Sequence, residues 1–148
     1  MDTGQQHLAF TSGATGSPNR IIYDVDVQTG DTNPLIANHI IQLNPTWSPD
    51  GRYLLYVAYD SNPGMYLWDS SSRQSVLLFA PAVLNMRSLS WSQDNRYILY
   101  APLSNASNNS ILRLDVTACL QDHAKCIPQP MTHIAGIYDN PRWRPHIP

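Results

Sequence analysis

The sequence predicts an all-β fold built from repeats, and its composition, a recurring stretch and the alternation of apolar residues each support this prediction. The 148-residue chain contains no glutamate and a single lysine, whereas proline, asparagine, serine and tyrosine are plentiful. Such a composition disfavours long helices. Every acidic side chain is an aspartate. Many lie beside Gly, Pro, Ser or Asn, where a short carboxylate bonds its own backbone in a turn.

A stretch around tryptophan recurs at a fixed spacing. Residues 45–56 return as residues 88–100. Their tryptophans, Trp47 and Trp91, are 44 positions apart, and a third copy closes the sequence at residues 140–145. The first two copies each predict a short strand ending in Trp, a tight turn, and a strand whose apolar residues alternate with period two. A repeat of this length indicates a fold made of similar units.

A second landmark repeats with the same period. Residues 22–26, 65–69 and 111–115 are apolar segments ending in aspartate, and these aspartates are 43 and 46 positions apart. Further strand candidates follow at residues 75–79 and 126–131. Each unit therefore predicts four strands joined by turns, which is the composition of a propeller blade.

The length of the chain suits one domain, which we expect to span residues 1–148 as a three-blade propeller segment. Blade 1 is expected at about 6–39, completed by a strand at 140–145. Blade 2 is expected at about 44–80 and blade 3 at about 87–133.

The tryptophan stretch resembles the repeat of the TolB-like (WD-like) β-propeller family, which is marked by a Trp-Ser-Pro-Asp-Gly turn before an apolar strand. The first copy matches this pattern in full, the second has Gln and Asn in place of Pro and Gly, and the third departs in the turn after its Trp. The resemblance implies the fold and gives these residues structural roles, with the tryptophans packed between blades. A stacking platform for sugars is the alternative role of the tryptophans. The residues that carry the resemblance are Trp47, Asp50, Gly51, Trp91, Asp94, Asn95 and Trp143.

The two ends of the chain resemble parts of one incomplete blade. Residues 7–11 predict a second strand with no Trp strand before it, and residues 140–145 a Trp strand with no second strand after it. Propellers close by sharing such strands within one blade. Three blades are fewer than the usual four to eight, and six are common in the family that the repeat resembles. We therefore expect two copies to form a six-bladed homodimer; the alternative is a piece excised from a larger propeller.

Charge and hydropathy argue against two classes of partner. The net charge is −2 and the sequence has no basic cluster, so we expect no nucleic-acid partner. No stretch approaches the roughly 20 apolar residues of a membrane helix, and residues 1–6 lack the pattern of a secretory signal. We expect no membrane insertion, and the sequence leaves the compartment open.

The two cysteines, Cys119 and Cys126, frame the expected connection between the third and fourth strands of blade 3. We predict a disulfide across a hairpin there, which would favour a periplasmic or extracellular location. Free thiols are one alternative. Zinc held with His123 is another, although a fourth ligand is not adjacent.

Candidate reactive groups are scattered, and no catalytic motif connects them. The sequence has no Gly-x-Ser-x-Gly, no His-Glu-x-x-His and no glycine-rich phosphate loop, so we expect a protein that is not an enzyme and needs no cofactor. Asp24, Asp26 and Asp31 faintly suggest a calcium loop but are better explained as turn residues. Asn105 and Asn108 fit the glycosylation pattern and are interpreted as a polar loop.

These observations predict a binding or assembly module. It would bind a protein or peptide over the propeller face, or assemble through its terminal strands. The alternatives are a propeller that binds carbohydrate or a small ligand between blades, and a fragment of a larger peptidase-like or sensor protein.

Overall fold

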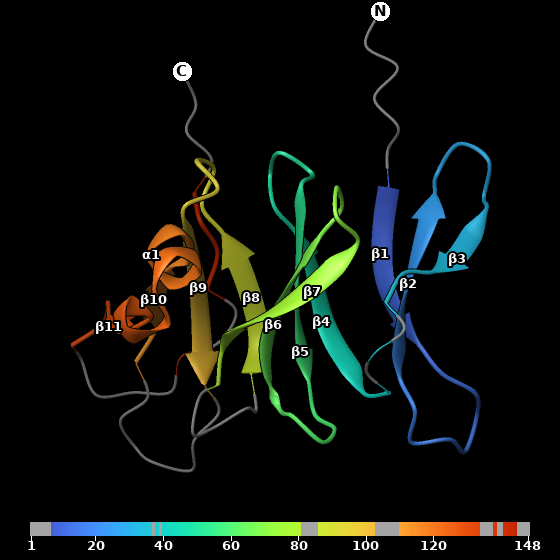
Figure 1. Ribbon diagram of the computed structural model, residues 1–148, viewed down its shortest axis with the longest axis horizontal. Helices are drawn as coiled ribbons and strands as arrows, with labels where there is room; N and C mark the ends of the chain where they lie inside the picture. Colours follow the sequence, from blue (N-terminus) through green and yellow to red (C-terminus); the bar gives the residue numbers. More distant parts are fainter. Residues whose placement is uncertain are drawn as a thin grey trace, which may run out of the picture.

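The computed structural model describes residues 7–36, 38, 40–80, 86–102, 110–133, 138 and 141–144. In this part the chain is all-β apart from one short α-helix and one 3-10 turn. Its strands form three antiparallel sheets that stand side by side (Figure 1). The elements are β1 (His7–Ser12), β2 (Ile21–Asp26), β3 (Thr32–Pro34), β4 (Gln42–Trp47), β5 (Tyr53–Ala58), β6 (Gly64–Asp69), β7 (Gln74–Phe79), β8 (Met86–Trp91), β9 (Tyr97–Pro102), β10 (Leu112–Asp115), α1 (Val116–Gln121), η1 (His123–Lys125) and β11 (Gln129–Pro130).

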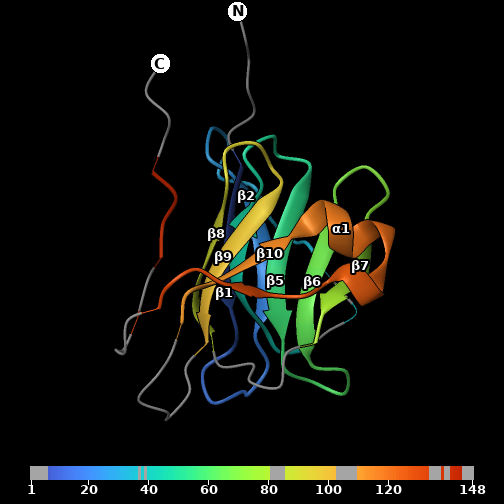
Figure 2. The same ribbon diagram turned by 90° about the vertical axis from the view of Figure 1, so that its left-hand side faces the viewer.

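Each sheet corresponds to one repeat of the sequence. Blade 1 has the strand order β1-β2-β3, blade 2 has β4-β5-β6-β7, and blade 3 has β8-β9-β10-β11. Strand β4 contacts both β1 and β8, so the innermost strands of the three sheets are neighbours. Figure 2 shows blade 3 in front of blade 2 from the side. The fold is therefore that of partial propeller blades stacked face to face.

The repeat turns depend on residues with left-handed backbone. Gly51 has φ 71° and Asn95 has φ 60° at the equivalent position, which asparagine tolerates better than other side chains. The Asn95 side chain also accepts a hydrogen bond from the backbone N–H of Asp50 over 3.1 Å. Asparagine thus both forms its own turn and ties it to the turn of the preceding blade.

The aspartate of each turn holds the turn together. In blade 3, Asp94 Oδ1 accepts hydrogen bonds from the Ser92 hydroxyl over 2.5 Å and from the Arg96 backbone N–H over 3.1 Å. Both bonds lower the pKa of Asp94 below its ordinary value, and the bond from Ser92 has the larger effect. In blade 2, Asp50 accepts the Ser48 hydroxyl in the same way over 2.6 Å.

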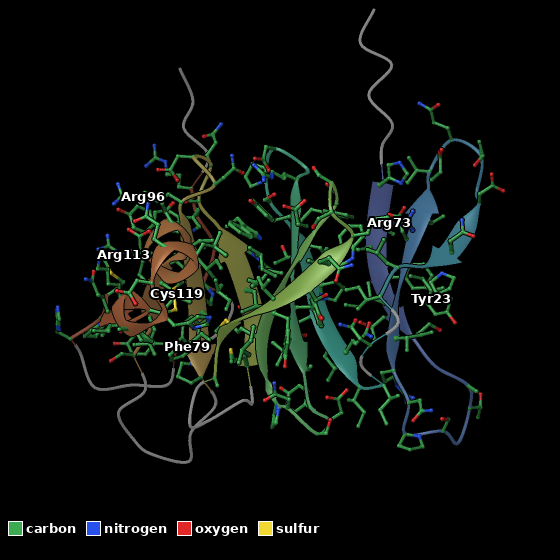
Figure 3. All side chains as sticks on the ribbon, in the orientation of Figure 1. Tyr23, Arg73, Phe79, Arg96, Arg113 and Cys119 are labelled. Atoms are coloured by element: carbon green, nitrogen blue, oxygen red, sulfur yellow. A yellow bond between two sulfur atoms is a disulfide. The ribbon has the colours of Figure 1, made fainter. Side chains whose placement is uncertain are left out.

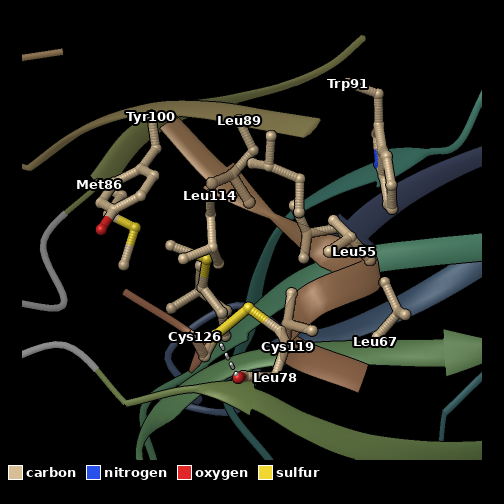
Figure 4. Close-up of a cluster of buried hydrophobic side chains, with 14 residues drawn as sticks. Leu55, Leu67, Leu78, Met86, Leu89, Trp91, Tyr100, Leu114, Cys119 and Cys126 are labelled. Atoms are coloured by element: carbon tan, nitrogen blue, oxygen red, sulfur yellow. Dashed lines mark hydrogen bonds between the residues drawn. A yellow bond between two sulfur atoms is a disulfide. The ribbon is translucent and has the colours of Figure 1, made fainter. Parts of the chain in front are cut away.

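Two apolar cores fill the spaces between blades. Side chains alternate along each strand, so one face of β5 and β6 packs toward blade 1 and the other toward blade 3. The core between blades 2 and 3 is the larger of the two and includes residues of helix α1 (Figure 4). Its buried residues are Leu55, Val57, Met65, Leu67, Leu78, Met86, Leu89, Trp91, Ile98, Tyr100, Leu114, Val116, Cys119 and Cys126.

A buried amide joins blades 1 and 2. Gln42 is fully buried, and its side chain accepts a hydrogen bond from the Ile22 N–H over 3.0 Å and donates to the Ile36 carbonyl over 3.2 Å. Its backbone N–H donates to the Arg20 carbonyl over 2.7 Å. A buried amide with both ends bonded adds little cost of desolvation and fixes the alignment of the two sheets.

The connection around the cysteines differs from the expected hairpin. Residues 116–121 form helix α1, capped by Asp115, whose side chain accepts the backbone N–H of Ala118 over 3.0 Å. Val116 and Cys119 are three positions apart and face the core. Cys119 and Cys126 are joined by a disulfide. Cys126 Sγ lies 3.2 Å from the Leu78 carbonyl oxygen (Figure 4), a close contact only, because a disulfide sulfur has no proton to donate.

Breaking this disulfide should lower stability. The bridge closes a loop with a sequence separation of 7 residues and anchors α1 on the outer end of blade 2. For a loop this short, we expect the loss of the bridge to reduce the free energy of unfolding by about 2 kcal/mol. Urea unfolding with and without reductant measures the difference. The double variant Cys119→Ala, Cys126→Ala is the control, and a reductant effect that persists in it would contradict the account.

Candidate functional site

The edge of blade 1 is incomplete in the described part of the chain. In blades 2 and 3 the first strand, β4 or β8, pairs with the second strand, β5 or β9. By register, β1 is the equivalent of β5 and β9, because His7 pairs with Asp26 as Tyr53 pairs with Asp69. No described strand lies on its other side. Among the described residues, blade 1 therefore has its second, third and fourth strands but not its first.

The C-terminal segment lies against blade 3. The Trp143 backbone N–H donates to the Ser90 hydroxyl over 3.3 Å, and Arg142 Nη1 donates to the Leu89 carbonyl over 3.1 Å. The Trp143 ring stacks on Tyr97 with centroids 6.4 Å apart. Strand β8 contacts β4 one blade earlier. Residues 141–144 thus dock where the first strand of a following blade would lie, and their pairing with blade 1 stays a prediction that needs another copy.

The three repeat tryptophans differ in one bond. Trp91 Nε1 donates to the Thr46 carbonyl, on the first strand of the preceding blade, over 3.2 Å. Trp47 Nε1 is buried without an acceptor among the described residues, and so is Trp143 Nε1. For Trp47, the acceptor equivalent to the Thr46 carbonyl would lie on a first strand of blade 1, which the described residues do not include.

A pocket of about 490 Å³ opens between blades 1 and 2. Blade 1 contributes His7 and Asp24, and blade 2 contributes Trp47, Trp68 and Pro49. The two indoles meet edge to face, with ring centroids 6.0 Å apart and planes at 69°. The pocket combines aromatic walls with one carboxylate and has a size that suits a side chain or small ligand.

Among the described residues, only one oxygen of the Asp24 carboxylate in this pocket has a hydrogen-bond partner. His7 Nδ1 and Asp24 Oδ2 are 2.7 Å apart and hydrogen-bonded, while Asp24 Oδ1 is buried and has no partner among the described residues. The strand registers place Leu67 of blade 2 and Arg113 of blade 3 at the equivalent position. Packing in this repeat therefore does not require a carboxylate there.

The equivalent position of blade 3 is occupied differently. The Arg113 guanidinium lies over the Tyr97 ring, 4.7 Å from its centroid. It stands on blade 3, far from blade 1 (Figure 3). The pocket between blades 1 and 2 thus combines a carboxylate with two indoles, while the equivalent position of blade 3 carries a guanidinium over a tyrosine ring.

Other candidate residues have structural contacts. Asp26 Oδ1 accepts backbone N–H groups of the turn that follows it, from Gln28 over 2.8 Å and Thr29 over 3.2 Å. In the described residues no three histidines, cysteines or aspartates are grouped as metal ligands. The disulfide leaves Cys119 and Cys126 no thiolate for zinc. The two glycosylation-pattern asparagines lie outside the described residues.

Sequence reasoning missed His7 and Trp68, and it considered Asp24 only as a turn or calcium residue. A signal existed in the repeat alignment, where Asp24 interrupts an apolar position that Leu67 fills in the next blade.

None of the described helices is long and apolar enough to span a membrane.

Comparison with known proteins supports the architecture. No protein-family model matches the sequence, and no curated protein sequence matches it. Among solved structures, TolB from Acinetobacter baumannii has a TM-score of 0.74 at 21% identity over 93% of this chain. The β-propeller domain of the Trilobed protease from Pyrococcus furiosus has a TM-score of 0.60 at 17% identity over 86% of it. Oligogalacturonate lyase from Vibrio parahaemolyticus has a TM-score of 0.64 at 13% identity over 94% of it.

The chain therefore has a TolB-like β-propeller fold, and similarity at this level concerns the fold alone. It covers 33% of the TolB chain and 40% of each of the other two. The chain spans less than half the length of the propeller structures it matches.

The different bonds of two tryptophans give a matched test. Trp91→Phe removes a hydrogen bond to the Thr46 carbonyl, whereas Trp47→Phe removes an N–H that has no acceptor within the described chain. In dilute protein, Trp91→Phe should therefore lower the free energy of unfolding by about 1 kcal/mol more than Trp47→Phe does. Urea unfolding at sub-micromolar concentration measures both. Equal losses would contradict the missing-acceptor interpretation.

Proposed function

We propose that this chain is a non-catalytic β-propeller module that binds a second copy of itself and closes a six-bladed ring through its terminal strands. One observation carries the proposal. Residues 141–144 dock on blade 3 in the place of a following first strand, while β1 of blade 1 has no described first strand. The two ends are complementary, so each can complete the other in a different copy.

The physical drive is the pairing of an open sheet edge. Backbone N–H and C=O groups along an unpaired strand favour pairing with another chain. Pairing β1 with residues 141–144 of the second copy would satisfy these groups and supply an acceptor for Trp47 Nε1. Because a two-fold axis relates the copies, the same contact would form twice and would pair the open side of β1 in both copies.

An excised piece of a longer propeller is the alternative origin of the missing blades. The coverage of 33% to 40% of the similar structures fits either case, since six blades contain twice the repeats of this chain. Three blades are too few to close a propeller ring, so the homodimer and the excised piece both require further blades. Solution mass distinguishes them.

The proposed role does not include catalysis. His7 and Asp24 form a hydrogen-bonded pair of the kind that can act as a general base, but Ser48, one of the two serines that line the pocket, has other partners. Its hydroxyl donates to Asp50 Oδ1 and accepts the Tyr53 backbone N–H over 2.9 Å. This serine is therefore not activated as a nucleophile.

A second candidate function is small-ligand or carbohydrate binding in the inter-blade pocket. The indoles of Trp47 and Trp68 and the carboxylate of Asp24 favour it, because sugars pack on aromatic faces and bond carboxylates. Titration with a panel of simple sugars, followed by tryptophan fluorescence, tests it. A response lost in Trp68→Ala would support this function over assembly.

The proposed compartment is oxidising, either the periplasm or the exterior of the cell. The Cys119–Cys126 disulfide supports this location, since such bonds persist where thiols are not kept reduced. A further protein or peptide ligand on the face of the assembled ring fits the same proposal.

Deleting the C-terminal segment tests assembly. The full chain should have the mass of two 16.6 kDa chains at tens of micromolar, and a chain ending at residue 139 should have the mass of one. The deletion should also lower thermal stability, because it removes Trp143 from Tyr97. Light scattering coupled to size exclusion measures the masses.

The control for this test is Trp143→Phe, which keeps the backbone that pairs and removes the indole N–H. It should still dimerise, with weaker affinity. A full-length chain that stays monomeric at high micromolar concentration would contradict the homodimer and favour the excised-piece alternative.

A further inference from the structure

The repeat register locates Arg144 in the proposed ring. Trp143 corresponds to Trp47 and Trp91, so the residue after it corresponds to Ser48 and Ser92. Ser48 donates its backbone N–H to the Tyr53 carbonyl over 2.8 Å, and Ser92 donates in the same way to Tyr97 over 2.8 Å. A first strand thus ends opposite the first residue of the second strand.

In blade 1 that first residue is His7. It pairs with Asp26 in the ladder, as Tyr53 pairs with Asp69 and Tyr97 with Asp115. If residues 141–144 of a second copy complete blade 1, Arg144 of that copy lies opposite His7 on the neighbouring strand. Directly opposed side chains in an antiparallel pair are about 5 Å apart at Cβ, well within the reach of an arginine.

Two residues that depart from the repeat pattern, Arg144 and Asp24, would come together beside His7 in the proposed dimer. In blades 2 and 3 the residue after the first-strand tryptophan is a serine, while the C-terminal copy has Arg144. The third strands of blades 2 and 3 carry Leu67 and Arg113, while blade 1 carries Asp24. The charges are opposite, and the acidic partner has a buried oxygen without a bond among the described residues. Charge complementarity therefore favours a second copy as the occupant.

Resting on the homodimer proposed above, we infer that the pocket between blades 1 and 2 is a guanidinium site for Arg144 of the second copy. Its guanidinium donates to Asp24 Oδ1, while His7 holds Oδ2. Trp47 and Trp68 line the same pocket and offer indole faces, on which a planar guanidinium stacks well. The carboxylate supplies charge and the indoles supply shape.

This contact makes the edge selective for the C-terminal strand. A first strand of the type found in blades 2 and 3 would bring a serine, which leaves the Asp24 carboxylate without a cation. In a two-fold ring the contact forms twice, so a change in one chain acts at two places. The site would thus select the C-terminal strand over other strands that could complete blade 1.

A charge exchange tests the inference. Asp24→Arg and Arg144→Asp should each raise the dimer dissociation constant at least roughly tenfold, because each places like charges together. The double variant restores opposite charges in reversed order and should bring the dissociation constant back to within a few fold of the original. Sedimentation equilibrium measures the constants, and circular dichroism checks that each variant is folded.

The control is Lys125→Asp, which makes the same change of charge on an exposed residue of η1 in the outer connection of blade 3. It should leave the dissociation constant unchanged. Single variants that dimerise as tightly as the original, or a double variant no better than the singles, would overturn the inference while the dimer stands. A full chain that is monomeric throughout would instead overturn the homodimer on which it rests.

A free cation is the rival occupant of the pocket. Methylguanidinium, titrated into the full-length Arg144→Ala variant, should bind weakly and lose binding when Asp24→Asn is added, if the chemistry of the site is as inferred. Such binding combined with full dimer affinity in Arg144→Asp would assign the pocket to a small organic cation and overturn the contact between copies.

Discussion

An antiparallel sheet leaves a row of backbone donors and acceptors on each outer strand, and pairing that row is the constraint on which this molecule depends. Blades 2 and 3 meet it at their second strands, because β4 pairs with β5 and β8 pairs with β9. Blade 1 does not meet it within the described chain. The tail at residues 141–144, already docked on blade 3, offers the strand that blade 1 lacks.

The same missing strand accounts for features that look unrelated. Trp91 finds its acceptor on β4, while Trp47 has none in the described chain, although both stand at the same position of the repeat. Asp24 Oδ1 is buried without a partner among the described residues, in the blade that has no described first strand. Arg144 breaks the repeat in the strand that would complete that blade. One assembly step would satisfy all three.

Local chemistry explains which parts were predictable from the sequence. The Trp-turn-strand pattern predicts three blades, and the left-handed Asn95 follows from its alignment with Gly51. Helix α1 is six residues long, too short to show a helical period, so the connection around Cys119 was expected to be a hairpin. The pairing of His7 with Asp24 joins residues 17 positions apart on different strands, and only the register reveals it.

Residue-resolved amide hydrogen exchange of β1 tests the central claim most directly. By equivalence with Tyr53, whose carbonyl bonds to Ser48, the N–H groups of His7 and Ala9 point toward the missing strand. They should exchange rapidly in dilute protein and become protected at high concentration, while the alternate amides bonded to β2 stay protected in both. Rapid exchange of the Ala9 N–H at every concentration would contradict completion of blade 1 by a second copy.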